Sequence, residues 1–228
     1  NRKELWTDRK TTGTIMGASA LANIDKGLHH LFLSQIETLG MEPVARRSGI
    51  VSQLAPERGR GSAWMAGIGP DCLMTVLDLE VEGAVDLTSC GPGYFCLGIM
   101  SPSCLETMPR PVSAPGPAGL VMYCQDAGSY AYRLKPRTPY VSRSLCFTPR
   151  FWEQLAFDRR SDGDALLERF ATAPQVLNAP HVGAMLQRLD ARTADAAATE
   201  LHLTALAAEA VACLMDTAEA EGQAEAAR

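Results

Sequence analysis

The fold is indicated first by residues 72–83, which read CLMTVLDLEVEG. An apolar run from Cys72 to Met74 passes into an alternation of apolar and polar side chains that ends at Gly83. Alternation with a period of two is typical of a strand with one face in a core, and glycine is common in the turn that follows. The stretch therefore predicts a half-buried β-strand.

Similar short segments follow this strand, and proline or glycine bounds each of them. We expect further strands at residues 93–99, 119–124, 129–134 and 140–147. Nine of the 14 prolines and all five tyrosines lie between Gly91 and Pro149. Many short strands separated by turns are typical of a small antiparallel barrel or sandwich.

Helical spacing replaces the strand pattern after Pro149. Thr148 can cap a helix and Pro149 suits its first position. Apolar residues then follow at intervals of three and four: Phe151, Trp152, Leu155 and Ala156. Further helices are predicted at residues 163–171, 180–189 and 193–220.

The last and longest of these helices carries an apolar stripe on one face. The stripe consists of Leu203, Leu206, Ala210, Cys213 and Leu214. A lone helix would leave such a stripe partly exposed. We therefore predict a homodimer whose interface contains Leu203, Leu206, Ala210 and Leu214.

The first 42 residues have a less regular pattern. Residues 24–39 fit a helix, although residues 30–37 also fit an alternating strand. We expect the helix, preceded by a flexible arm at residues 1–14. The chain then divides into residues 1–42 with the arm and helix, residues 43–149 with the barrel, and residues 150–228 with a helical subdomain.

Charge and hydropathy exclude two classes of partner. Residues 150–228 contain 7 basic and 13 acidic side chains, a balance of −6, and no segment has the cluster of lysine and arginine that neutralises DNA phosphates. No apolar run reaches the roughly 20 residues that cross a bilayer, and the first residues lack the apolar core of a signal peptide. We expect a cytoplasmic protein that contacts neither membrane nor DNA directly.

Four segments together resemble the sensor half of AraC/XylS-type transcription regulators. They are residues 73–83, 91–95 (GPGYF), 132–140 (YRLKPRTPY) and 147–155 (FTPRFWEQL). In that family a strand with the pattern G-x-G-x-x-x-L, a turn with basic residues and proline, and a junction with the pattern P-x-F-W-x-x-L precede helices used for dimerisation. The resemblance covers residues 43–217.

The resemblance implies an α+β fold, in which a cupin-like antiparallel β-barrel is followed by a helical dimerisation subdomain. It also implies that the barrel senses a small-molecule effector and that a pair of helix-turn-helix units binds DNA. We expect those units to be absent from this chain, so that DNA is a partner of the parent protein only.

Metal and enzyme chemistry find little support in the sequence. Cupin metal sites use clustered histidines, and residues 43–149 contain none. There is no nucleophile elbow of the type G-x-S-x-G and no phosphate-binding loop. We expect no metal, no cofactor and no enzymatic activity.

The aromatic residues of the barrel segment are the best material for an effector pocket, because such pockets are concave and mostly apolar with a few polar groups. We assign effector binding to Trp64, Tyr94, Cys96, Tyr123, Tyr130 and Tyr132. Alternation places Tyr130 and Tyr132 on one face of their strand. Arg133 and Arg143 could pair with an anionic effector, although arginines at such positions are more often solvated.

Three alternatives remain open on the sequence alone. The chain could be a metal-independent cupin-like enzyme, or a dimerisation scaffold whose barrel is filled with side chains. The seven cysteines could also form a thiol or metal sensor, although Cys90, Cys96 and Cys104 have no spacing typical of a metal knuckle. Buried cysteines that only fill the core are the more common case.

Overall fold

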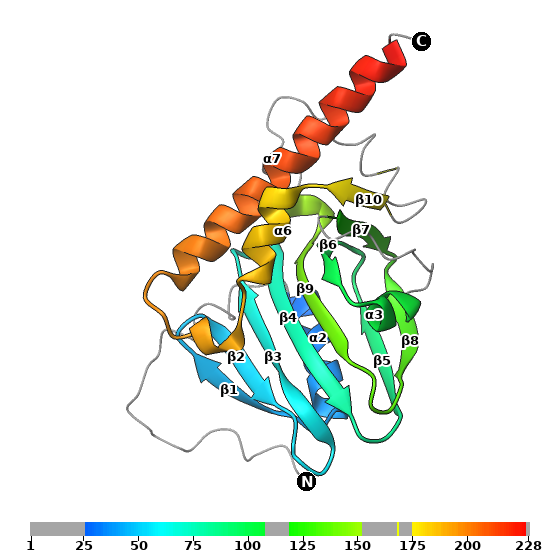
Figure 1. Ribbon diagram of the computed structural model, residues 1–228, viewed down its shortest axis with the longest axis vertical. Coiled ribbons are helices and arrows are strands. Elements are labelled where there is room, and N and C mark those ends of the chain that lie inside the picture. The colour runs from blue at the N-terminus through cyan, green and yellow to red at the C-terminus, as the bar shows by residue number, and fades with distance from the viewer. Residues whose placement is uncertain (1–25, 108–118, 152–167, 169–174, 227–228) are drawn as a thin grey trace.

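A mixed α+β fold with one large antiparallel sheet is seen in the computed structural model (Figure 1). The structure describes residues 26–107, 119–151, 168 and 175–226. The predicted arm at residues 1–14 and the predicted helix at residues 163–171, apart from residue 168, lie outside the described residues. None of the described helices is both long enough and apolar enough to cross a bilayer.

The large sheet has eight strands, and a separate sheet has two. The order in the large sheet is β1 (Glu42–Arg46), β2 (Gly49–Gln53), β3 (Gly59–Gly67), β4 (Cys72–Val81), β9 (Tyr140–Phe147), β6 (Tyr94–Met100), β7 (Gly119–Gln125) and β10 (Gln175–Asn178). The small sheet pairs β5 (Val85–Gly91) with β8 (Gly128–Leu134). The five predicted strands are confirmed as β4, β6, β7, β8 and β9.

The prediction of a barrel is not confirmed, because the described strands do not close on themselves. Closure would require hydrogen bonds between the two edges of the large sheet, and β1 and β10 each pair with one neighbour only. The strands β5 and β8 pair with each other and stay separate from the large sheet. The sheet also takes β10 from the segment that we assigned to a helical subdomain.

Helices cover the two faces of the large sheet unequally. In Figure 1, α6 and α7 lie in front of the sheet and α2 lies behind it. The helices are α2 (Lys26–Thr38), α3 (Pro102–Glu106), α6 (Pro180–Gln187), the 3-10 turn η1 (Ala191–Thr193) and α7 (Thr199–Ala226). The helix reading of residues 24–39 is thus confirmed over the described part, and the strand alternative is wrong.

Alternate side chains along the strands of the large sheet belong to two separate hydrophobic cores, one on each face of the sheet. On β4, Cys72, Met74 and Val76 pack with α6 and α7, and we call this face the helix side. On the same strand, Leu73 and Leu77 pack with α2, β5 and β8, and we call this face the pocket side. The period of two in residues 72–83 therefore reflects burial on both faces rather than one buried face.

The helix that carries the predicted dimer stripe packs within the chain. Leu203, Leu206, Ala210 and Leu214 are at most 2% exposed, and they belong to the core on the helix side of the sheet. The stripe is not left exposed to solvent, because side chains from the β-strands of the same chain cover it. Those four residues are therefore buried within the chain rather than exposed to a second copy.

The end of β9 is attached to the start of β4 by a buried polar contact. Thr148 Oγ1 donates to Asp71 Oδ1 at 3.0 Å, and the Thr148 amide donates to the Asp71 carbonyl oxygen. The amide of Phe151 lies 3.4 Å from Thr148 Oγ1, as expected for a helix cap at this position. The contact fixes where the sheet ends and the helical segment begins.

Candidate functional site

A pocket lies on the pocket side of the large sheet, under a layer formed by α2, β8 and α3. Its walls come from strands β4, β6, β7 and β9 and from that layer. The residues that line it are Phe32, Gln35, Thr75, Leu77, Tyr94, Cys96, Met100, Cys104, Thr107, Tyr123, Gln125, Tyr132, Tyr140, Ser142, Ser144 and Cys146. We refer to it as the tyrosine pocket.

Four tyrosines form most of its aromatic surface. The rings of Tyr132 and Tyr140 are stacked, with centroids 6.2 Å apart and an angle of 15° between their planes. Tyr94 and Tyr123 meet edge to face with centroids 6.5 Å apart. The two pairs offer both a flat stacking surface and phenol hydroxyl groups, which suits a planar ligand with polar substituents.

One hydrogen bond links the covering layer across the pocket. The hydroxyl of Tyr132 on β8 donates to Oε1 of Gln35 on α2 at 2.7 Å. Gln35 is buried although it is a polar residue of an amphipathic helix. Buried side-chain amides nearly always have a hydrogen-bond partner, and Tyr132 supplies one for Gln35. This hydrogen bond joins α2 to β8 above the pocket.

The floor of the pocket is polar and follows one strand. Alternate residues of β9 point into it, namely Tyr140, Ser142, Ser144 and Cys146. The hydroxyl groups of Ser144 and Thr75 lie 2.9 Å apart and hydrogen-bond to each other. Ser142 and Ser144 are buried, so these hydroxyls face the pocket rather than bulk solvent.

Among the described residues that line the tyrosine pocket, none is Asp, Glu, Lys, Arg or His. Burial, followed by the negative charge of nearby groups, holds the pKa values of Tyr123 and Tyr140 well above the usual tyrosine range. Burial also raises the pKa of Cys104 to about 12. Those tyrosines and this thiol are uncharged near neutral pH, and the described lining residues offer no cationic or carboxylate side chain to balance a charged ligand.

The size of the pocket restricts what can enter it. Its volume is about 60 Å³, several times the roughly 10–15 Å³ that one water requires by the same measure. A ligand of a few heavy atoms fits as the structure stands. A larger one requires the layer formed by α2 and β8 to move outward.

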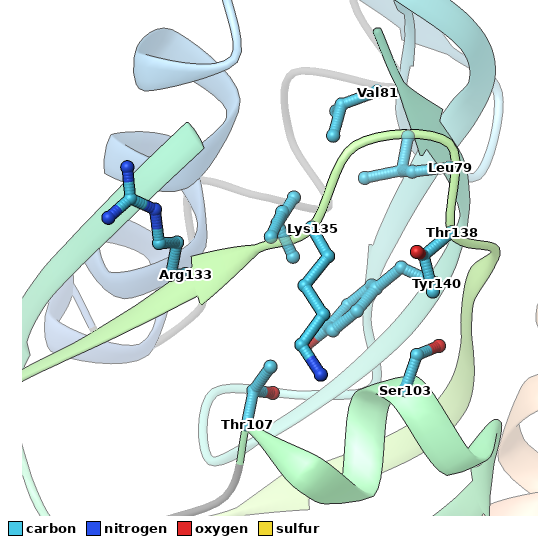
Figure 2. Close-up of a pocket in the computed structure, with 9 residues that line it drawn as sticks. Leu79, Val81, Ser103, Thr107, Arg133, Lys135, Thr138 and Tyr140 are labelled. Carbon is cyan, nitrogen blue, oxygen red and sulfur yellow. The ribbon is translucent and has the colours of Figure 1, made fainter. Parts of the chain in front are cut away.

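A shallow neighbouring depression shares Thr107 and Tyr140 with the tyrosine pocket. Figure 2 shows the side chain of Lys135 extending beside the Tyr140 ring toward Thr107 and Ser103. The Lys135 ammonium is paired with Glu106, with Nζ and Oε2 2.6 Å apart. The charged groups near Tyr140 thus lie outside the tyrosine pocket and neutralise each other.

The predicted effector residues divide into two groups. Tyr94, Cys96, Tyr123 and Tyr132 are brought together in the tyrosine pocket. Trp64 is not among the lining residues, because it points to the helix side, where it is fully buried and its Nε1 donates to the Ser48 carbonyl oxygen at 2.7 Å. The side chain of Tyr130 lies outside the described part of the structure.

The arginines proposed as partners for an anion lie elsewhere. Arg133 is exposed and ion-paired with Asp86. Arg143 points to the helix side, where its Nε donates to the carbonyl oxygen of Leu189. It lines a more open groove of about 520 Å³ together with Arg46, Gln53, Ser62, Asp78, Asp190, Arg192, Asp195 and three apolar residues. We refer to this as the charged groove.

Several lining residues were missed from the sequence. Ser142, Ser144 and Cys146 follow Tyr140 at intervals of two, so the alternation of the predicted strand could have found them once Tyr140 was placed. Gln35 and Thr75 had no such signal. They reach the pocket because α2 and β4 pack on it from distant parts of the sequence.

The described residues contain no group of three or more histidine, cysteine or acidic side chains that could hold a metal ion. The polar groups that the described lining residues bring to the pocket are hydroxyl, amide and thiol groups, which lie among aromatic rings. Comparisons of the whole chain with models of protein families, with curated proteins and with solved structures find no match.

Proposed function

We propose that this chain is the effector-sensing part of a transcription regulator of the AraC/XylS type, with an open cupin-like sheet as the sensor body. The observation that carries the proposal is the tyrosine pocket, which is partly open, aromatic and lined by hydroxyl groups, with no Asp, Glu, Lys, Arg or His among its described lining residues. A scaffold needs no such pocket, and its polar residues would be costly to bury for packing alone.

The lining defines the chemical class of the effector. Walls with no Asp, Glu, Lys, Arg or His among their described residues favour an uncharged ligand, since an ion would lose its hydration without gaining such a side chain as counter-ion. Stacked rings favour a planar ligand, and Ser142, Ser144 and Gln35 supply donors and acceptors for hydroxyl or carbonyl substituents. We therefore expect a small, neutral, planar compound such as a phenol or an uncharged heterocycle.

The contact between Tyr132 and Gln35 provides a way to transmit binding. A ligand that hydrogen-bonds to either group competes with the bond that holds α2 to β8. Binding would then favour a different position of α2, by the difference in ligand affinity between the two arrangements. In a regulator, that shift would be passed to the parts of the protein that bind DNA.

Dimerisation belongs to the proposal, but through a different face of α7. Leu201, Ala205, Ala208 and Ala212 are exposed and recur at intervals of four, three and four. Leu201 is 74% exposed. This outer stripe lies opposite the buried stripe, and small residues at such spacing let a second α7 approach closely. We place the contact between two copies there.

The experiment is a thermal-shift screen of neutral planar compounds beside carboxylate and amine analogues of the same size. Ligand binding to the folded state raises the melting temperature according to ligand concentration over its dissociation constant. Neutral compounds should raise it, and Tyr132→Phe should change the response while the exposed-site control Thr88→Val does not. A response to the charged analogues only would contradict the proposal.

A further inference from the structure

Two cysteines face each other across neighbouring strands at the bottom of the tyrosine pocket. Cys96 on β6 and Cys146 on β9 are direct partners in the antiparallel register. Cys146 Sγ donates to Cys96 Sγ at 3.7 Å, and both side chains are about 1% exposed. Paired positions on adjacent antiparallel strands lie roughly 4.5–5.5 Å apart at Cα, which is within the range that a disulfide spans.

The backbone around the pair is held close and fixed. Gly98 on β6 is paired with Ser144 on β9, and a Cβ atom at Gly98 would lie 2.6 Å from the Arg143 carbonyl oxygen. Only glycine allows this close approach. The sulfur atoms therefore start within about 2 Å of the bonded distance of roughly 2.05 Å, without a movement of either strand as a whole.

The surroundings give the two thiols different roles. Burial opposes ionisation of Cys96, but hydrogen bonds to its sulfur from Cys146, Tyr123 and Ser144 outweigh burial and lower its pKa. The hydrogen bond to Cys96 and burial raise the pKa of Cys146. Cys96 is the better nucleophile, because the thiolate is the reactive form. Cys146 is placed to attack second.

Both sulfur-bearing residues line the tyrosine pocket, which is partly open to solvent. A small uncharged oxidant can enter a pocket whose described lining residues include no Asp, Glu, Lys, Arg or His. We propose that Cys96 and Cys146 are a reversible redox pair that hydrogen peroxide converts into a disulfide at the bottom of this pocket. The proposal goes beyond effector sensing and stands whether or not the chain belongs to a regulator.

The chemistry balances in two steps. The Cys96 thiolate attacks one oxygen of the peroxide, the O–O bond breaks, Cys96 becomes a sulfenic acid, and the hydroxide that leaves takes a proton to form water. The Cys146 thiol then attacks the sulfenic sulfur, the S–S bond forms, and the second water leaves. Two thiols and one peroxide thus give one disulfide and two waters, and a dithiol reductant reverses the reaction.

The other cysteines provide internal comparisons. Cys90 is exposed and has no thiol partner at this distance among the described residues. Cys104 lines the same pocket but has a raised pKa of about 12. Cys72 is buried on the helix side and does not line the pocket. Selective chemistry at Cys96 and Cys146 would therefore follow from their geometry rather than from exposure.

The test is peptide mapping of the whole chain by mass spectrometry after hydrogen peroxide, with the remaining thiols alkylated in denaturant. We expect one peptide pair linked through Cys96 and Cys146, a loss of two free thiols per chain, and full recovery with dithiothreitol. The preference should vanish when peroxide is added to urea-unfolded chain. Oxidation of Cys90 alone, or a link from Cys96 to Cys104, would overturn the proposal.

Variants assign the order of attack. Cys146→Ser should leave Cys96 as a sulfenic acid that dimedone labels, whereas Cys96→Ser should leave Cys146 unlabelled. Cys72→Ala is the matched control, since it removes a buried thiol from the other face and should leave the disulfide intact. Labelling of Cys146 in Cys96→Ser as fast as labelling of Cys96 in Cys146→Ser would contradict the assigned roles. If a variant does not fold, the peptide map of the wild-type chain decides the proposal.

Discussion

Trp64 shows how one side chain can be assigned to the wrong face. Its indole is fully buried on the helix side and donates to the carbonyl oxygen of Ser48. We predict that Trp64→Phe lowers the free energy of unfolding by about 2 kcal/mol or more, because it leaves a buried carbonyl without its donor and removes packed volume. Urea unfolding measures the loss. Ligand-induced thermal shifts should keep their size, and a lost shift would place Trp64 at the binding site.

A second residue-scale prediction concerns Thr148 and Asp71. Asp71 is 4% exposed, and its Oδ1 accepts from the Thr148 hydroxyl. Thr148→Val keeps the shape but removes that donor, so it should lower the free energy of unfolding by about 1–3 kcal/mol. Thr88→Val, at an exposed strand position, is the control in the same urea titration and should change it little. Equal effects at the two sites would refute a special role for the buried contact.

The sequence allowed some residues of the tyrosine pocket to be predicted, in segments where apolar and polar side chains alternate with a period of two. Tyr94, Cys96, Tyr123 and Tyr132 could be proposed because aromatic residues and alternation occur in the same segment. Trp64 could not be separated from them, since both faces of the large sheet are buried and alternation does not say which face holds a pocket. Gln35 required the tertiary contact of α2.

At the scale of elements, α7 has two faces with opposite roles. We predict that Leu206→Asp unfolds or strongly destabilises the chain, because it puts a charge at a position only 1% exposed. Ala208→Asp, on the outer stripe, should leave the melting temperature nearly unchanged and reduce association between copies. Thr204→Asp, exposed but outside the stripe, is its control.

Sedimentation at increasing concentration separates these outcomes. Wild type and Thr204→Asp should associate, whereas Ala208→Asp should stay monomeric with its fold retained by circular dichroism. If Leu206→Asp gave a well-folded monomer, the buried stripe would be the interface after all. If the wild-type chain stayed monomeric at every concentration, the homodimer itself would be refuted.

Element prediction succeeded where local patterns were strong and failed where packing decides. The strand at residues 72–83 and the helix that ends at Gln187 followed from periodicity and turn residues. The strands β1, β2, β3, β5 and β10 were missed; β1, for example, is exposed along its whole length, and β3 begins with glycines among polar residues. Such strands form because a neighbour supplies their hydrogen bonds.

For the whole molecule, the buried tyrosines predict a loss of stability in alkali. Tyr123 and Tyr140 have raised pKa values in the folded chain, chiefly through burial. Above the ordinary tyrosine pKa of about 10 the unfolded state releases protons that the folded state retains, so the free energy of unfolding falls as pH rises. Below that pH the contribution is fully present.

Urea unfolding at about pH 8 and about pH 11 tests this sign. Tyr140→Phe removes one of the two phenols and should make the fall between those pH values smaller than in wild type. Buried thiols such as Cys72 and Cys104 add to the same trend, so the comparison with the variant is the informative quantity. An unchanged fall in Tyr140→Phe would contradict the buried, protonated state of this residue.

The architecture as a whole was only partly predictable. Composition and the change of pattern after Pro149 indicated an α+β fold, and that class is confirmed. The sequence could not tell that the sheet stays open instead of closing into a barrel, because the pairing of strand edges depends on contacts between residues far apart in sequence. The shared core also joins β10, α6 and α7 to the sheet across the boundary that we expected near residue 149.

The central claim is that the tyrosine pocket, and not the charged groove, binds the effector. Titration calorimetry of the best compound from the screen tests it with two matched variants, Ser142→Leu, which adds bulk to the wall of the tyrosine pocket, and Ser62→Leu, which adds the same bulk to the wall of the charged groove. We predict that Ser142→Leu weakens binding by about tenfold or more, about 1.4 kcal/mol, and that Ser62→Leu binds as wild type does. Binding that Ser62→Leu abolishes and Ser142→Leu retains would contradict the claim.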